Sequence, residues 1–134
     1  IKKIADTMTS GGRKISTHTV ESYLDALCAS FILYKVNRFD LKGKQYLKSG
    51  DKYYIADVAL RSYLLGNKFI DRGFILENSI YLELLRRGYK ISIGKFNDYE
   101  VDFVTQKNGL TEYFQICESV RSKETLQREL RALE

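Results

Sequence analysis

The second half of the chain carries the pattern that most restricts its fold, because one helix, three strand-length segments and another helix follow one another. Apolar residues recur with helical spacing over residues 70–87, and Gly88 ends that pattern. Segments rich in β-branched and aromatic residues follow at 89–93, 99–105 and 112–119, and a second helical pattern starts near residue 123. We therefore expect an α/β (α+β) fold with a central mixed sheet flanked by helices.

The first half of the chain changes its hydrophobic period near residue 32. A short helix is predicted over residues 2–8, and Ser16 or Thr17 can cap a second helix. The second helix has an apolar stripe made of Val20, Leu24, Leu27 and Phe31. Residues 33–38 then alternate as in a strand, and turns flank two short β-prone pieces at 45–47 and 53–55. This order is that of a winged helix-turn-helix, so we predict such a domain at 1–57 and an α/β core at 58–134, packed closely together.

Composition excludes several classes of protein. The chain of 134 residues is 44% hydrophobic and 29% charged, with no apolar run of the roughly 20 residues that span a membrane. No signal peptide opens it, so we expect a cytoplasmic protein without membrane contact. Cys28 and Cys117 stand in apolar runs and are predicted to be free thiols. Both ends look cut, since no Met opens the chain and a helical pattern runs to its last residues; we expect a truncated piece of a longer protein.

The charge favours a polyanionic partner such as DNA. The formal net charge is +5, and residues 1–60 carry 10 Lys or Arg against 6 Asp or Glu. If the second helix enters a major groove, its first turns supply the contacts, and the lysines of the hairpin follow the phosphates. A solvated helix start and a merely soluble wing are the alternatives. The candidate contacts are Thr17, His18, Thr19, Ser22, Lys42, Lys44, Lys48 and Lys52.

Two kinds of chemistry have little support in the sequence. His18 is the single histidine, which argues against Ser-His-Asp or Cys-His catalysis. Gly43-Lys44 lacks both the upstream glycine and the Ser or Thr of a phosphate-binding P-loop.

Polar side chains in the second half predict a metal site. Glu77 falls in the middle of the apolar face of the long helix, where a carboxylate is costly unless it is paired or metal-bound. In the strand at 99–105, Glu100 and Asp102 share one face, while Tyr99, Val101 and Phe103 take the other. Gln115 lies inside the next strand. Convergence of Glu77, Asp102 and Gln115 would suit Mg²⁺, which prefers oxygen ligands and serves phosphodiester hydrolysis.

Structural roles for these three residues remain open beside the metal site. Glu77 can satisfy backbone donors near the start of its helix. Asp102 can bond a neighbouring loop or Lys95, and Gln115 can be an ordinary hydrogen-bonded strand residue. Glu83, in contrast, is explained as a surface ion pair with the two arginines that follow it.

The chain resembles a widespread family of bacterial and archaeal proteins that pair an N-terminal AAA-type ATPase domain with an uncharacterised C-terminal domain. The matching stretches cover most of the chain in the order of the family. They are TVESYL at 19–24, KYYIAD at 52–57, LEN at 76–78, LLRRGY at 84–89, EVDFV at 100–104 and QIC at 115–117.

This resemblance implies an ATPase domain upstream of residue 1 and a PD-(D/E)xK nuclease-like core behind the winged helix. It implies that Glu77, Asp102 and Gln115 hold Mg²⁺ and act in catalysis. The assisting lysine of that motif is replaced here by Cys117, and a thiol supplies no fixed positive charge, which leaves cleavage open. We therefore expect a nucleic-acid-interacting module of an ATPase; the alternative is a non-catalytic protein-interaction or regulatory domain.

Overall fold

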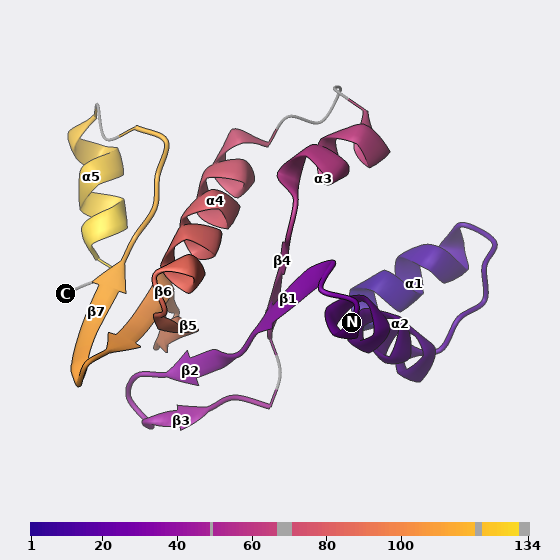
Figure 1. Ribbon diagram of the computed structural model, residues 1–134, viewed down its shortest axis with the longest axis horizontal. Helices are drawn as coiled ribbons and strands as arrows, with labels where there is room; N and C mark the ends of the chain where they lie inside the picture. The colour runs from indigo at the N-terminus through magenta and orange to yellow at the C-terminus, as the bar shows by residue number, and fades with distance from the viewer. Residues whose placement is uncertain (49, 67–70, 120–121, 132–134) are drawn as a thin grey trace. The chain divides into compact units, whose positions relative to one another are not determined.

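The computed structural model describes residues 1–48, 50–66, 71–119 and 122–131. The chain divides into two compact units, Ile1–Tyr34 and Lys35–Glu134. The first unit holds helices α1 (Lys2–Ser10) and α2 (Thr17–Ala29), as Figure 1 shows. The Ser16 hydroxyl accepts a hydrogen bond from the Thr19 backbone amide, so the predicted cap of the second helix is confirmed. Phe31 does not extend the apolar stripe, because the helix ends at Ala29 and Phe31 has a φ of 56°.

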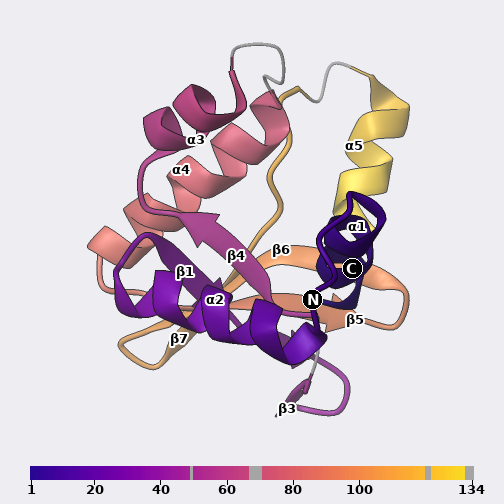
Figure 2. The same ribbon diagram turned by 90° about the vertical axis from the view of Figure 1, so that its right-hand side faces the viewer.

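The second unit combines helices with a mixed sheet, which confirms the predicted α/β class. Its strands are β2 (Arg38–Asp40), β3 (Gln45–Tyr46), β5 (Lys90–Phe96), β6 (Tyr99–Lys107) and β7 (Leu110–Phe114), in the order β3-β2-β5-β6-β7. β2 and β5 are parallel, and the other neighbours are antiparallel. The helices are α3 (Val58–Leu65), α4 (Arg72–Arg86) and α5 (Lys123–Leu130) (Figure 2).

The helix ends follow local sequence signals. Asp57 accepts from the backbone amides of the first turn of α3, and Asp71 accepts from the Phe74 amide at the start of α4. Gly88, with a φ of 77°, follows the last turn of α4 as predicted. Residue 70, the predicted start of the long helix, and residues 132–133 of the last helical pattern lie outside the described residues.

The two β-prone pieces expected to form a hairpin do not pair with each other. β3 pairs with β2, whereas β4 (Lys52–Ile55) pairs with β1 (Leu33–Val36) in a separate two-stranded sheet. A tight turn explains this pairing, because Asp40 accepts from the Lys42 amide and Lys44 has a φ of 50°. β2 and β3 therefore continue the five-stranded sheet, and the division between the two compact units falls after Tyr34.

A β-bulge in β6 alters the predicted alternation of side chains. Ser92 is paired with Val104 and Gly94 with Val101, so three steps along β6 match two steps along β5. Phe103 consequently lies on the same side as Glu100, not opposite to it as the strict alternation predicted. A Cβ atom on Gly94 would come within 2.7 Å of Val104 Cγ2, which explains the glycine beside the bulge.

The core between α4, β4 and the sheet is aromatic. The rings of Tyr54 and Tyr81 are stacked with centroids 4.4 Å apart, and Phe103 contacts both rings. Asn78 is fully buried beside them. Its side chain donates to the Ile55 carbonyl at 2.9 Å and accepts from the Ile55 amide at 2.8 Å. This amide therefore fixes β4 against α4.

Two further sequence predictions can be compared with the structure. Cys28 and Cys117 are both free thiols, as predicted, and the structure leaves both half-buried. None of the helices in the described part of the chain is long and apolar enough to cross a membrane.

Candidate functional site

Glu77 lies where α4 faces β4, and two side chains of that strand hold it. Lys52 Nζ donates to Glu77 Oε1 at 3.0 Å, and the Tyr54 hydroxyl donates to the same oxygen at 2.6 Å. Lys52 and Tyr54 share one face of β4 because side chains two residues apart in a strand point the same way. The predicted costly carboxylate on the helix face is therefore paired with a cation and a hydroxyl.

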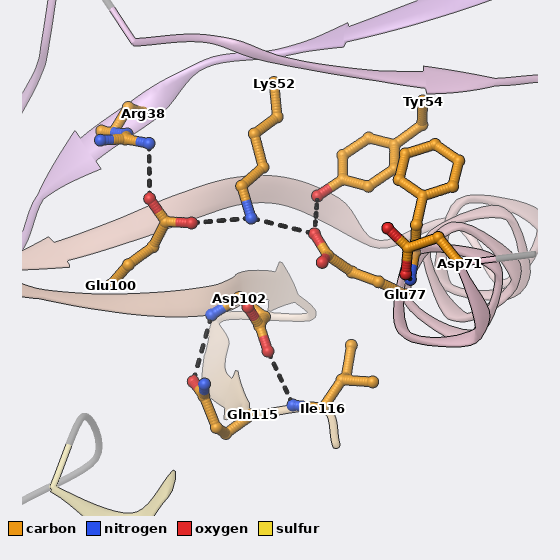
Figure 3. Close-up of polar contacts among 10 residues, drawn as sticks. Arg38, Lys52, Tyr54, Asp71, Glu77, Glu100, Asp102, Gln115 and Ile116 are labelled. Carbon is orange, nitrogen blue, oxygen red and sulfur yellow. Dashed lines mark hydrogen bonds and ion pairs between the residues drawn. The ribbon is translucent and has the colours of Figure 1, made fainter. Parts of the chain in front are cut away.

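The ammonium of Lys52 also links α4 to the sheet. Lys52 Nζ lies 2.7 Å from Glu100 Oε1 on β6, and Arg38 on β2 pairs with the other oxygen of Glu100. Figure 3 shows the resulting row of Arg38, Glu100, Lys52 and Glu77. All four side chains are between 21% and 35% exposed, so solvent only partly weakens their interaction.

Asp102 and Gln115 form a second polar group beside this row (Figure 3). The Ile116 amide donates to Asp102 Oδ2 at 2.8 Å, and the Asp102 amide donates to Gln115 Oε1 at 3.3 Å. The structure thus brings two of the three predicted ligands into direct contact. Cys117, which the resemblance predicts to replace an assisting lysine, follows Ile116 and is half-buried.

Glu77 and Asp102 share one electrostatic environment, because the charge of Glu77 contributes to the pKa of Asp102. Burial is the main cause that raises the pKa of Asp102, and the Ile116 amide opposes it. The negative charges of Glu77 and Glu100 raise it further, while Lys52 lowers it. Glu77 and Glu100 therefore hold the ammonium of Lys52 directly, and Asp102 feels its charge without a contact that pairs the two.

Lys52 and Tyr54 remain protonated in this environment. Burial lowers the pKa of Lys52, but its contacts with Glu100 and Glu77 outweigh burial and leave the pKa above its ordinary value. Burial and the bond to Glu77 raise the pKa of Tyr54 far above its usual range. Both groups are therefore fixed donors to Glu77 at neutral pH.

The donor set can be compared with the needs of a divalent cation. Among the described residues, no three side chains of His, Cys, Asp or Glu are grouped as a metal-binding set. The predicted set has two carboxylates and one amide, and its hydrogen bonds use Oε1 of Glu77, Oδ2 of Asp102 and Oε1 of Gln115. One oxygen of each carboxylate and the amide oxygen of Gln115 are the hard donors that suit Mg²⁺ completed by water.

The predicted nucleic-acid contacts fall in both compact units. Thr17, His18 and Ser22 are exposed on the first turns of α2, and the Ser22 hydroxyl donates to the His18 carbonyl. Thr19 is half-buried, with its hydroxyl 2.8 Å from that of Ser16. The hairpin lysines are exposed, in the turn between β2 and β3 and after β3; they are Lys42, Lys44 and Lys48. Lys52, predicted as a fourth phosphate contact, instead pairs with Glu77 and Glu100.

Sequence reasoning missed Tyr54, Arg38 and the buried amide of Asn78 as parts of the site. A local signal existed for Asn78, because it lies three residues before Tyr81 on the apolar face of α4. No local signal points to Tyr54 or Arg38, because their partners Glu77 and Glu100 lie 23 and 62 residues away along the chain. Glu83, on the other hand, pairs with Arg86 and Arg87 at 2.7 Å as predicted.

Comparison with known proteins gives a family for the chain. Residues 1–70, about half of the chain, match the family described as a domain of unknown function, DUF8612. The chain belongs to the DUF8612 family. No solved structure matches this DUF8612 chain.

Two curated relatives of the DUF8612 chain are much longer proteins. A Haemophilus influenzae protein with the name "Uncharacterized protein" is 41% identical over 115 residues, which are 86% of this chain and 29% of that protein. "Uncharacterized protein MJ1544" of Methanocaldococcus jannaschii is 32% identical over 138 residues, which are 100% of this chain and 30% of that protein. The chain thus spans less than a third of either relative.

Proposed function

We propose that this chain is a nucleic-acid-interacting module of an AAA-type ATPase, with a nuclease-like core in its second unit. In this proposal Glu77, Asp102 and Gln115 hold Mg²⁺ beside a bound phosphodiester. The observation that carries it is the placement of these side chains: the Asp102 amide donates to Gln115 Oε1 at 3.3 Å, and Glu77 lies close enough for its negative charge to raise the pKa of Asp102 in addition to burial. Such a group of carboxylates gains most from a bound cation.

Each side chain of the site has a defined role in the proposal. Bound Mg²⁺ would polarise a phosphate and lower the pKa of a coordinated water. Lys52 supplies the positive charge that Cys117 does not, because its ammonium lies 3.0 Å from Glu77 Oε1 and stays protonated. Tyr54 orients Glu77 through its hydroxyl, and the Ile116 amide orients Asp102.

Exposed residues of both units supply the contacts to nucleic acid in this proposal. The start of α2 presents Thr17, His18 and Ser22, which matches the residues that a recognition helix turns toward a major groove. Lys42 and Lys44 stand in the tight turn between β2 and β3, which takes the part of a basic wing. The upstream ATPase domain is proposed from the resemblance alone, and the two relatives are long enough to include one.

Fluorescence anisotropy of labelled duplex and single-stranded DNA, with Mg²⁺ and over a range of salt, tests this function. We expect micromolar binding that weakens steeply as salt rises. Replacing Lys42, Lys44 and Lys48 with Gln should reduce the salt slope by about 0.9 for each duplex phosphate that no longer has a lysine partner. The matched control replaces Lys2, Lys3 and Lys123, three exposed lysines outside the turn, and should keep the parent slope. Absence of binding at low salt would overturn the proposal.

A non-catalytic protein-interaction or regulatory domain is the second candidate. It is favoured by one observation, that Glu77 and Asp102 already have hydrogen-bond donors from Lys52, Tyr54 and the Ile116 amide. In that case the carboxylates stabilise the fold and need no cation. The melting temperature in the presence of Mg²⁺ separates the two functions. A cation that binds only the folded chain must raise the melting temperature, whereas a domain that needs no cation shows no such rise.

A further inference from the structure

A pocket of about 300 Å³ lies on the sheet of the second unit, and each of the five strands contributes to it. Val104 lines the pocket, whereas its neighbour Phe103 packs against Tyr54 and Tyr81. Because neighbouring residues of a strand point to opposite faces, the pocket lies on the face of the sheet turned away from Glu77 and α4. It is therefore separate from the candidate metal site.

Aromatic rings form the two sides of this pocket. Tyr46 on β3 and Tyr113 on β7 are 55% and 51% exposed although both line it. Phe39 supports Tyr46 edge to face, with ring centroids 5.2 Å apart and an angle of 71°. Exposed flat rings on a sheet are platforms on which unpaired bases stack, at about 1–3 kcal/mol per base.

The charge around the pocket selects an anionic ligand. Lys44 and Lys90 line it, and no acidic side chain does so within the described part of the chain. Ser92, Gln106 and Thr111 add hydroxyl and amide groups that can bond the edges of a base. Aromatic rings, two ammonium groups and uncharged polar groups together match a nucleobase followed by its phosphates.

We infer that this face of the sheet, lined by Phe39, Tyr46, Tyr113, Lys44 and Lys90, binds a single-stranded segment of nucleic acid. The bases of a duplex are stacked on each other and cannot reach the rings, so the site selects unpaired nucleotides. The inference rests on the proposed function only in taking nucleic acid as the partner. It adds a binding face that shares Lys44 with the proposed wing and does not depend on Mg²⁺.

Anisotropy of a labelled oligothymidylate of about 12 nucleotides tests the inference, because single-strand sites of this kind cover about 4–16 nucleotides. Tyr113→Ala should weaken binding about tenfold, in line with the loss of one stacked base. Lys90→Gln should weaken it too and reduce the salt slope by about 0.7, the value for one phosphate of a single strand. The matched controls are Tyr63→Ala, at an 85% exposed tyrosine of α3, and Lys123→Gln on α5; both should bind like the parent.

The outcomes separate this inference from the proposed function. If Tyr113→Ala and Lys90→Gln bind the oligothymidylate as tightly as the parent does, the single-strand site is overturned. The proposed interaction with DNA then still stands. A parent that binds neither duplex nor single strand would overturn both. Equal competition by a duplex and by the unlabelled oligothymidylate would also contradict the inference, since a duplex offers no free base. Both variants change exposed side chains, so unchanged melting temperatures serve as the check on folding.

Discussion

Asn78→Leu is expected to destabilise the second unit by about 2–4 kcal/mol, because it leaves two backbone groups of β4 without their partner. Leucine is close to asparagine in shape, so the loss comes mainly from the amide. The Ile55 carbonyl and amide, at 2.9 and 2.8 Å from the Asn78 side chain, would face the core unpaired. Each such group costs about 1–3 kcal/mol when desolvated, and partial exposure of Ile55 keeps the sum in the lower range.

Urea denaturation followed by near-ultraviolet circular dichroism measures this effect, since the stacked Tyr54 and Tyr81 rings report on the core. The control is Ser79→Ala, at the exposed neighbour of Asn78, with an expected change within about 0.5 kcal/mol. A Leu variant as stable as the Ser79 control would show that the bond between β4 and α4 is dispensable. Because β4 also carries Lys52 and Tyr54, the expected loss extends to the geometry of the candidate site.

Lys52→Met is expected to destabilise the chain by about 1–3 kcal/mol at neutral pH. The substitution keeps most of the apolar stem but removes the ammonium between Glu77 and Glu100. Breaking a fully buried ion pair costs about 3–5 kcal/mol, and the partial exposure of these side chains reduces that figure. Arg38 remains on Glu100, so the largest uncompensated charge falls on Glu77 and Asp102.

The pH dependence distinguishes this electrostatic cause from lost packing. The positive charge of Lys52 lowers the pKa of Asp102, so removing the ammonium raises that pKa further in the folded chain, and the variant loses stability as the pH rises through it. The difference from the parent should therefore be larger near pH 7 than near pH 3, which lies below the ordinary pKa of an aspartate. Lys48→Met, the same change at an exposed lysine after β3, is the control in urea denaturation. A deficit that is equal at both pH values would contradict the charge argument.

The parts of the fold that depend on local chemistry could be predicted from the sequence. Ser16 and Asp57 cap their helices because a hydroxyl or carboxylate at those positions satisfies the first backbone amides. The pairing of β3 with β2 could not be predicted from the strand signals, since several β-prone pieces compete for one partner. The bulge in β6 shifts the strict alternation of its side chains by one residue. Its one trace in the sequence is Gly94 on the neighbouring strand, where a Cβ atom would lie too close to Val104.

The residues of the candidate site also differ in whether the sequence alone could identify them. Glu77 could be identified because a carboxylate on an apolar helix face needs a partner. Its partners Lys52 and Tyr54 could not, because they come from a strand 25 and 23 residues away. Asp102 lies on β6, but β7 ends at Phe114, so Gln115 lies just after the strand and not inside it as predicted. Their contact follows from the antiparallel pairing of β6 with β7, which ends one residue earlier at Phe103 and Phe114.

Titration of Mn²⁺ followed by electron paramagnetic resonance tests the proposed metal site most directly, because the signal of the free ion falls as it binds. We expect the parent to bind Mn²⁺, Mg²⁺ to compete, and affinity to fall as the pH is lowered through the raised pKa of Asp102. Asp102→Asn should lose binding, while Glu83→Gln, at a surface carboxylate paired with Arg86 and Arg87, should keep it. A parent that leaves Mn²⁺ free, or an Asn variant that binds equally well, would contradict the site formed by Glu77, Asp102 and Gln115.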